Sequence, residues 1–195
     1  MFALSTNLKN WADSSFSLVL EECGGNGSCL FHCIAVAASR LMGQKWSMEY
    51  VRDRIAATIT HDTVQEFLEL VMEDQSHQLL NGSVRFLTTD SADRVQEVVS
   101  APGLGFQGTD ITLRWLLKHD PVFRSVGFVL FSSFGPAYTE ILNESTATQF
   151  ILLFNHSNAH WQLANLVDAK NCAFSSITPE TLKLLKQFMA EKKMI

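Results

Sequence analysis

The sequence predicts an α+β fold, and three observations lead to that prediction. The chain has 195 residues, of which 47% are apolar and 18% charged, so it can form one compact domain with a substantial core. Apolar residues recur at helical spacing in the first half. From Val126 onward they gather into short runs rich in β-branched and aromatic residues. Helices followed by a block of strands are typical of the α+β class.

Helical patterns fill most of the first half and return at the C-terminus. Helices are expected at about 29–42, 47–59, 63–80, 91–99, 109–118 and 179–193. The first of them begins near Cys29, and Gly43 is placed to stop it. Ser47 is placed to cap the second helix, and Thr63 with Glu66 has the spacing of a capping box at the start of the third.

Four strand patterns follow the helices of the first half. They occupy residues 126–132, 137–142, 148–154 and 160–166. Turn-forming residues at 143–145 and 155–158 lie between them, so we expect consecutive strands to pair as hairpins. Residues 1–22 show no clear period, and the pattern assigns no element to them.

Composition and charge exclude several classes of function. The formal net charge is −5 and no basic run is present, so nucleic acid is not the expected partner. The apolar stretches are far shorter than the ~18 residues that a membrane span needs, and no secretory signal is recognisable. Four cysteines are too few and too clustered for a disulfide scaffold and fit a reducing compartment. We therefore expect a cytoplasmic monomer that binds neither nucleic acid nor a membrane.

The loop before the first helix is the sharpest local feature of the sequence. Turn-forming residues occupy positions 24–28, and Cys29 follows in the first turn of the helix. Unpaired backbone N–H groups and the helix dipole favour negative charge at such a place, and they lower the pKa of a cysteine thiol. The same N–H groups can hold the oxyanion of a tetrahedral intermediate. Cys29 is therefore a candidate nucleophile.

His160 is the candidate base for this nucleophile. It begins the last strand pattern, beside a turn. Cysteine and histidine are far apart in the sequence of thiol proteases, and the fold brings them together. Strand alternation places Gln162 on the same face as His160, where its side-chain carbonyl can orient the imidazole ring.

Structural roles compete with some functional ones. A cysteine on an apolar helix is usually a small buried hydrophobe, and core packing is the expected role of Cys33. Cys23, Cys29, His32 and Cys33 do not complete a zinc site, because their spacing contains no CxxC pair. The glycines at 24–27 lack the lysine and hydroxyl of a phosphate-binding loop. We expect no metal and no cofactor. Solvated positions are expected for His61, His77, His119 and His156.

Three segments resemble the ovarian tumour (OTU) family of cysteine proteases. Asn26-Gly27-Ser28-Cys29-Leu30-Phe31-His32 resembles the family's Asp-Gly-Asn-Cys-Leu-Phe signature. Gly108-Thr109-Asp110-Ile111-Thr112-Leu113 resembles its Trp-Gly-x-x-x-x-Leu segment, with Gln107 where an aromatic residue is usual. The run 150–154, followed by His160-Trp161, resembles its closing strand and His-aromatic motif. The segments occur in the family's order and cover about residues 20–167.

The resemblance implies a papain-like fold, with a central, mostly antiparallel sheet packed between helices, in a single protease domain over residues 1–195. It implies that Cys29 is the nucleophile, that His160 is the general base and acid, and that the loop at Asn26 supplies the oxyanion hole. The implied reaction is hydrolysis of the isopeptide or peptide bond after the C-terminal Gly-Gly of ubiquitin or a ubiquitin-like modifier, through a thioester acyl-enzyme.

The resemblance also suggests where the modifier binds. Gly27 and Ser28 are candidate substrate contacts, and a recognition helix is expected within residues 60–100. Trp161 has two alternative roles: it either lines the channel that admits Gly-Gly or is a core aromatic residue.

The chain departs from the family's pattern at three positions. Asn26 stands where the family has Asp, and Ser28 stands where it has Asn. Gln162 stands where Asp or Asn often follows the histidine, and a neutral amide stabilises an imidazolium less than a carboxylate does. Other candidates for the third catalytic residue are therefore Asn158, Asn165 and Asp13.

Two other functions stay open. A protease of the same fold that chiefly processes a precursor polyprotein, as some viral relatives do, would use the same catalytic residues. A ubiquitin-binding module whose catalysis has decayed would account for the replacements at Asn26, Ser28 and Gln162.

Overall fold

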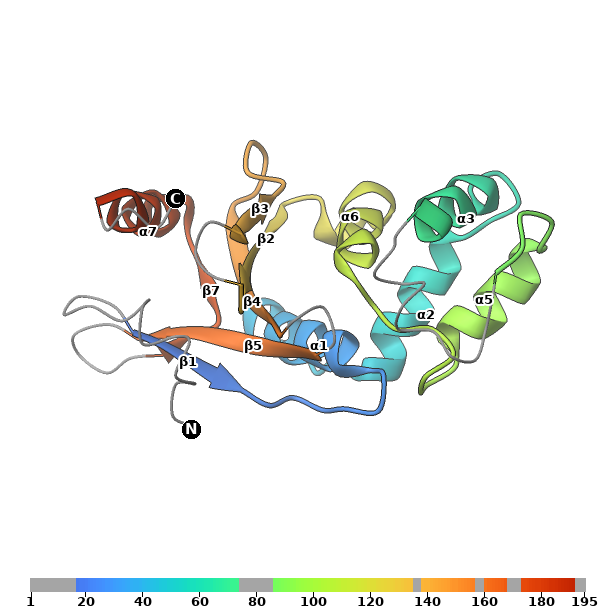
Figure 1. Cartoon of the computed structure of the whole chain (residues 1–195), viewed down its shortest axis with the longest axis horizontal. Helices are drawn as coiled ribbons and strands as arrows, with labels where there is room; N and C mark the ends of the chain where they lie inside the picture. Colours follow the sequence, from blue (N-terminus) through green and yellow to red (C-terminus); the bar gives the residue numbers. More distant parts are fainter. Residues whose placement is uncertain (1–16, 74–85, 135–137, 157–159, 168–172, 192–195) are drawn as a thin grey trace. The chain divides into compact units, whose positions relative to one another are not determined.

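The computed structural model describes residues 17–73, 86–134, 138–156, 160–167 and 173–191 (Figure 1). The chain divides into two compact units. Residues 24–121 form one, here called the helical unit, and residues 1–23 with 122–195 form the other, here called the sheet unit. The prediction of a single protease domain over residues 1–195 stays a prediction.

The helical unit contains the helices predicted in the first half of the sequence. They are α1 (Cys29–Met42), α2 (Met48–Thr58), α3 (Val64–Glu73), α5 (Ala92–Ser100) and α6 (Asp110–His119). A 3-10 turn at Pro121–Phe123 follows them where the chain enters the sheet unit. Gly43 ends α1 with φ 68° and donates its N–H to Ser39 O at 3.1 Å, the left-handed ending that glycine favours. Ser47 caps α2 by accepting the N–H of Tyr50, as predicted. The part of the third predicted helix beyond Glu73 lies outside the described residues.

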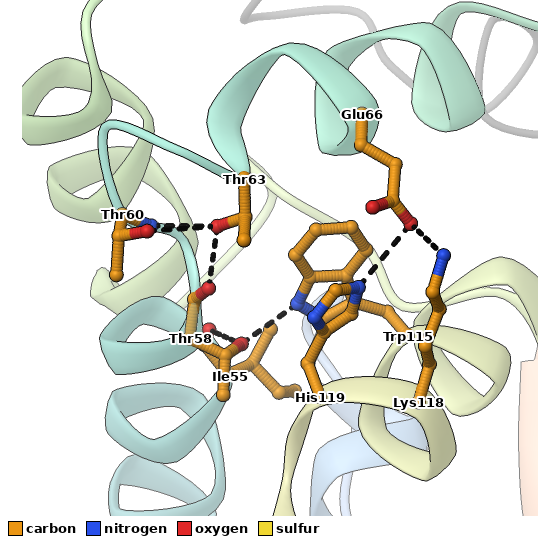
Figure 2. A network of polar contacts seen from close by, with 8 residues as sticks. All are labelled: Ile55, Thr58, Thr60, Thr63, Glu66, Trp115, Lys118 and His119. Carbon is orange, nitrogen blue, oxygen red and sulfur yellow. Dashed lines mark hydrogen bonds and ion pairs between the residues drawn. The ribbon is translucent and has the colours of Figure 1, made fainter.

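A polar network joins helices α2, α3 and α6 (Figure 2). The indole Nε1 of Trp115 donates to Thr58 Oγ1 at 2.7 Å, and the His119 ring stacks on Trp115 with ring centroids 3.9 Å apart. Glu66 accepts from Lys118 Nζ at 2.8 Å and lies 3.2 Å from His119 Nε2. The side chain of His119 is only 16% exposed, so the prediction that it is solvated was wrong.

The capping box predicted at Thr63 and Glu66 is also wrong. Thr63 Oγ1 donates to Thr58 O at 2.7 Å, and Glu66 reaches across to α6 instead of back to its own helix terminus. Spacing alone cannot distinguish these outcomes, because a carboxylate in the first turn of a helix can equally well bind a cation on a neighbouring helix.

The sheet unit contains a seven-stranded mixed sheet, and the α+β prediction is confirmed. Its strands are β1 (Ser17–Glu21), β2 (Val126–Ser132), β3 (Glu140–Leu142), β4 (Gln149–His156), β5 (His160–Val167), β6 (Ala173–Phe174) and β7 (Ser176–Ile177). The order is β1-β5-β4-β2-β3, with β6 beside β5 and β7 beside β4. β2 and β4 run parallel, and the other pairs are antiparallel. β1, β6 and β7 were not predicted from the sequence.

One predicted hairpin is wrong. The β2–β3 and β4–β5 pairs are antiparallel as expected, but β3 and β4 are not neighbours, and β4 pairs with β2 in parallel instead. Residues 150–154 of β4 are all buried, which requires a central position with both faces covered. β3 has one buried residue of three and fits the sheet edge. Gly127 of β2 is also explained, because a Cβ there would lie 2.4 Å from the Phe150 ring.

Helix α7 (Pro179–Glu191) covers one face of this sheet through a continuous apolar core. Leu182, Leu185 and Met189 of α7 pack in one cluster with residues of β1, β2, β4 and β5, including Leu20 and Phe154. The cluster fixes β1 against β5 even though the two strands lie far apart in the sequence. No helix among the described residues is both long and apolar enough to cross a lipid bilayer.

Candidate active site

The loop before α1 is a tight turn that only certain residues can form. The N–H of Ser28 donates to Gly25 O at 3.1 Å, and the two residues between them, Asn26 and Gly27, have φ of 55° and 77°. Asparagine and glycine are the residues that adopt this left-handed region most readily. A Cβ on Gly27 would lie 2.8 Å from Gly103 O, so this position also has no room for a side chain. The Asn26-Gly27 sequence therefore fixes the chain's path into α1.

Cys29 is the first residue of α1, as predicted, and it is 9% exposed. The first helical bond runs from the N–H of His32 to Ser28 O at 3.0 Å, so the N–H groups of residues 29–31 have no acceptor one turn back in the helix. Ser28 occupies the N-cap position, but its side chain makes no capping bond, and the first turn carries no acidic residue. This end of α1 therefore favours a negative charge, such as a thiolate or an oxyanion, at Cys29.

The hydroxyl of Ser28 is used elsewhere. Its Oγ accepts from Arg52 Nη2 at 3.0 Å and from the N–H of Gly103 at 3.3 Å. Arg52 is fully buried at 0% exposure, and its guanidinium lies 3.9 Å from the centroid of the Phe31 ring. The Arg52 side chain thus contacts residues on both sides of Cys29.

Arg52 is the functional candidate that sequence reasoning missed in the helical unit. It lies on the buried face of α2 together with Met48, Val51, Ile55 and Ala56. These positions follow the helical repeat, so a charged residue in the middle of an apolar stripe was the signal that could have found it.

His160 is the first residue of β5, and its imidazole contacts a residue that the sequence did not indicate. Its Nε2 lies 2.9 Å and 3.0 Å from the two carboxylate oxygens of Glu22, one residue beyond the end of β1. A carboxylate only accepts hydrogen bonds, so Nε2 carries the proton and Nδ1 is the basic nitrogen. The side chains of His160 and Glu22 are 36% and 43% exposed.

Gln162 lies on the His160 face of β5, but it contacts Glu22 rather than the histidine. Its Nε2 donates to Glu22 Oε1. In the β1–β5 register Glu21 faces Leu163, so the next residue along, Glu22, comes opposite Gln162. The pattern that could have found Glu22 is the alternation of Leu18 and Leu20 toward the core, which Glu22 continues.

The other candidates for the third catalytic residue are placed differently. Asn165 projects from the opposite face of β5, and its Nδ2 donates to Glu21 Oε2 at 3.1 Å. Asn158 and Asp13 lie outside the described residues. Trp161 is 3% exposed and also projects from the face opposite His160, a burial that favours the core role over the channel role.

No protein-family model and no curated protein matches the sequence. A solved OTU domain in complex with ubiquitin has a similar structure, with a TM-score of 0.53 over 88% of this chain and 82% of that chain, at 15% sequence identity. The chain has the fold of an OTU domain. The fold implied by the sequence motifs is thereby confirmed.

Two further OTU structures are similar at lower TM-scores. An OTU deubiquitinase from Wolbachia pipientis wMel is 13% identical, with 90% of this chain and 98% of that chain covered and a TM-score of 0.48. An OTU deubiquitinase from Wolbachia pipientis wMel bound to ubiquitin is 12% identical, with 80% of this chain and 98% of that chain covered and a TM-score of 0.43.

Proposed function

We propose that this OTU-fold protein is a thiol-dependent deubiquitinase. It hydrolyses the isopeptide or peptide bond after the C-terminal Gly-Gly of ubiquitin or a ubiquitin-like modifier. The observation that carries the proposal is the position of Cys29 at the uncapped N-terminus of α1, within the fold of an OTU domain. The structurally similar OTU domain in complex with ubiquitin supports the choice of modifier.

In the proposed reaction the thiolate of Cys29 attacks the carbonyl carbon of the terminal glycine. The carbonyl oxygen becomes an oxyanion, and backbone N–H groups of the 26–29 loop stabilise it, other than that of Ser28, which donates to Gly25 O. His160 takes the proton of the Cys29 thiol on Nδ1 and then gives it to the leaving amine, and the C–N bond breaks to leave a thioester on Cys29. His160 next takes a proton from water, whose oxygen displaces the thiolate and releases the free carboxylate of the modifier.

Glu22 has the role that the sequence suggested for Gln162. Its carboxylate holds the Nε2 proton of His160, fixes the ring's tautomer and stabilises the imidazolium that forms during the reaction. Gln162 contacts Glu22 and orients it. The carboxylate that this chain lacks two residues after the histidine is thus supplied from the end of β1.

The test uses ubiquitin with a C-terminal thiol-reactive warhead, followed by intact-mass spectrometry. Wild type is expected to form one adduct. Cys29→Ala is expected to form none, and His160→Ala is expected to form little. Cys23→Ala is the matched control, because Cys23 is a partly exposed thiol outside the proposed chemistry and its removal should leave the adduct unchanged. An adduct on folded Cys29→Ala, or none on folded wild type, would overturn the proposal.

The same experiment separates the other two functions. A decayed ubiquitin-binding module would bind ubiquitin without covalent capture. A protease that chiefly processes a precursor would react faster with a peptide spanning its native cleavage junction than with ubiquitin.

A further inference from the structure

Arg52 connects the end of α5, the loop at 27–28 and the loop at 103–106 of the helical unit. Its Nη1 donates to Val99 O at 2.9 Å, at the end of α5. Its Nη2 lies within hydrogen-bonding distance of four acceptors in two loops. They are Ser28 Oγ at 3.0 Å, Gly27 O at 3.5 Å, Gly103 O at 3.3 Å and Phe106 O at 2.9 Å. The guanidinium also lies over the ring of Phe31 on α1.

The chemistry of this contact set is unusual for a buried cation. Burying a guanidinium is costly unless hydrogen bonds and an opposite charge compensate it. All five acceptors around Arg52 are uncharged carbonyl or hydroxyl oxygens. Arg54, two residues along the same helix, shows the common alternative: its Nε and Nη2 contact the buried carboxylate of Asp120 at 2.7 Å and 2.5 Å. Both Nη atoms of Arg52 have acceptors, its buried Nε has none, and none of these acceptors is a carboxylate.

Cys29 lies in the chain between Ser28 and Phe31, and the Arg52 side chain contacts both of these residues. Burial lowers the pKa of Arg52 to about 10, so the guanidinium stays protonated at neutral pH, and the negative charges of Cys29 and Glu49 oppose this lowering. Electrostatic interaction is mutual, so a guanidinium favoured by the thiolate favours the thiolate in turn. His32 is another titratable group next to the loop, and its ring packs against Gly24; Glu22 and Cys23 directly precede the loop in the chain.

The hydrogen bonds of Arg52 also determine which way the loop faces. Because Ser28 Oγ and the carbonyls of Gly27 and Gly103 point toward the guanidinium, the Ser28 hydroxyl is withdrawn from the N-terminus of α1. A serine at this position would otherwise cap the helix and compete with an oxyanion for the same N–H groups.

We propose that Arg52 is the positioning residue of the nucleophile: it fixes the 27–28 loop from the buried side and supplies the positive charge that favours the Cys29 thiolate. The proposal rests on the proposed function only in taking Cys29 as the nucleophile.

The test measures how fast iodoacetamide alkylates Cys29 as a function of pH, with peptide mass mapping to separate Cys29 from the other cysteines. The midpoint of the profile reports the fraction of thiolate without any ubiquitin substrate. In Arg52→Met the midpoint is expected to rise by about 1 pH unit, so alkylation below the midpoint slows about tenfold. Arg52→Lys keeps the charge and is expected to stay within about 0.3 units of wild type.

The matched control is Arg54→Met. It removes an arginine of the same helix and leaves Asp120 buried without its cation, so it destabilises the fold as a merely structural change would. Its midpoint is expected to equal that of wild type. Equal midpoints in Arg52→Met and wild type would overturn the proposal, and so would a shift of the same size in Arg54→Met. If Arg52→Met does not fold, Arg52→Gln takes its place. The electrostatic role would then be overturned if the midpoint of Arg52→Lys rises as much as that of folded Arg52→Gln.

Failure of this proposal differs visibly from failure of the proposed function. If wild type captures the ubiquitin warhead but the Arg52 variants keep the wild-type midpoint, only the role of Arg52 is wrong. If the midpoint shifts as expected but no ubiquitin adduct forms, the thiol is activated for a different substrate. Repeating the profile in His160→Ala separates the contribution of Arg52 from that of the histidine, and the Arg52 shift is expected to persist there.

Discussion

The surroundings of Cys29 and the surroundings of His160 are built in opposite ways. Arg52, next to the cysteine loop, is fully buried and makes its hydrogen bonds to backbone carbonyls and a serine hydroxyl. His160 and Glu22 form an ion pair whose side chains are both more than a third exposed. Water and salt screen the second arrangement and barely reach the first. The charge next to the proposed nucleophile is therefore buried within the fold, whereas the charges next to the proposed base are exposed to solvent.

The largest expected effect comes from removing the nucleophile. Cys29→Ala is expected to lower kcat/KM on ubiquitin substrates at least about a thousandfold, because no other group at that position can form the acyl-enzyme. Its unfolding free energy should change by about 1 kcal/mol, since none of the hydrogen bonds described above for Arg52 goes to the thiol. Progress curves and thermal denaturation check both statements. A variant that loses activity only because it unfolds would contradict the comparison.

The next largest effect is on stability. It tests whether buried hydrogen bonds hold the surroundings of Cys29 in place. Arg52→Met leaves the buried acceptors Val99 O and Phe106 O without their donor. The expected loss in unfolding free energy is about 3 kcal/mol. Glu22→Gln should cost less than about 0.5 kcal/mol, because exposed ion pairs contribute little. Chemical denaturation of both variants measures the two losses in unfolding free energy. Similar losses would mean that the surroundings of Cys29 and of His160 do not differ as described.

A smaller effect on kcat/KM is expected from changes to the residues around His160. Glu22→Gln keeps the shape of the side chain but removes the charge that stabilises the imidazolium, so kcat/KM should fall about tenfold. Glu21→Gln is the matched control, because Glu21 contacts Asn165 on the opposite face of β5. Its kcat/KM should stay within about twofold of wild type. If Gln162→Leu lowers kcat/KM more than Glu22→Gln, then Gln162 and not Glu22 is the main partner of the histidine.

The smallest expected effect comes from the exposed charges of the helical unit. The hydrogen bond from Lys118, and then that from His119, hold the pKa of Glu66 below its ordinary value of 4.5. A carboxylate with a lowered pKa stabilises the fold above the ordinary value, and that stabilisation disappears as the pH falls through the lowered one. Glu66 is 37% exposed, so Glu66→Gln should cost about 0.5 kcal/mol at neutral pH and nothing well below pH 4.5.

Denaturation of wild type and Glu66→Gln at both pH values checks the sign. Glu69→Gln, on the same helix, is the control, because Glu69 contacts the neutral Gln65. A Glu66→Gln loss that grows at low pH would show that the pair with α6 is not what stabilises the contact.

The features predicted correctly from the sequence are those whose causes lie close together in the chain. The start of α1 at Cys29 and its end at Gly43 follow from local turn and capping chemistry. The same is true of α2 behind Ser47 and of the β4–β5 hairpin. The candidate nucleophile and base were predicted because each occurs within a short motif, and their catalytic roles stay predictions.

The missed features depend on contacts between distant segments. β1 has only five residues, and the alternation of Leu18 and Leu20 does not reveal that β1 pairs with β5, so the sequence did not connect Glu22 to His160. The wrong β3–β4 hairpin has the same origin, because parallel pairing of β2 with β4 is set by burial of the whole sheet. Arg52 was missed for a third reason. Its position on an apolar helix face is visible in the sequence, but its hydrogen-bond acceptors at Gly103 and Phe106 lie in a loop that no sequence pattern describes.

The pairing of β1 with β5 also determines the order in which the site can be assembled. Glu22 and His160 are 138 positions apart, whereas the hydrogen bonds of Arg52 to Gly27 and to Phe106 span 25 and 54 positions. A ribosome synthesises the chain from its N-terminus, so every residue that surrounds Cys29 in the helical unit exists before His160 does. Glu22 is made early and must wait for β5. A nascent chain therefore contains Cys29 well before it contains His160, the base proposed to act with it.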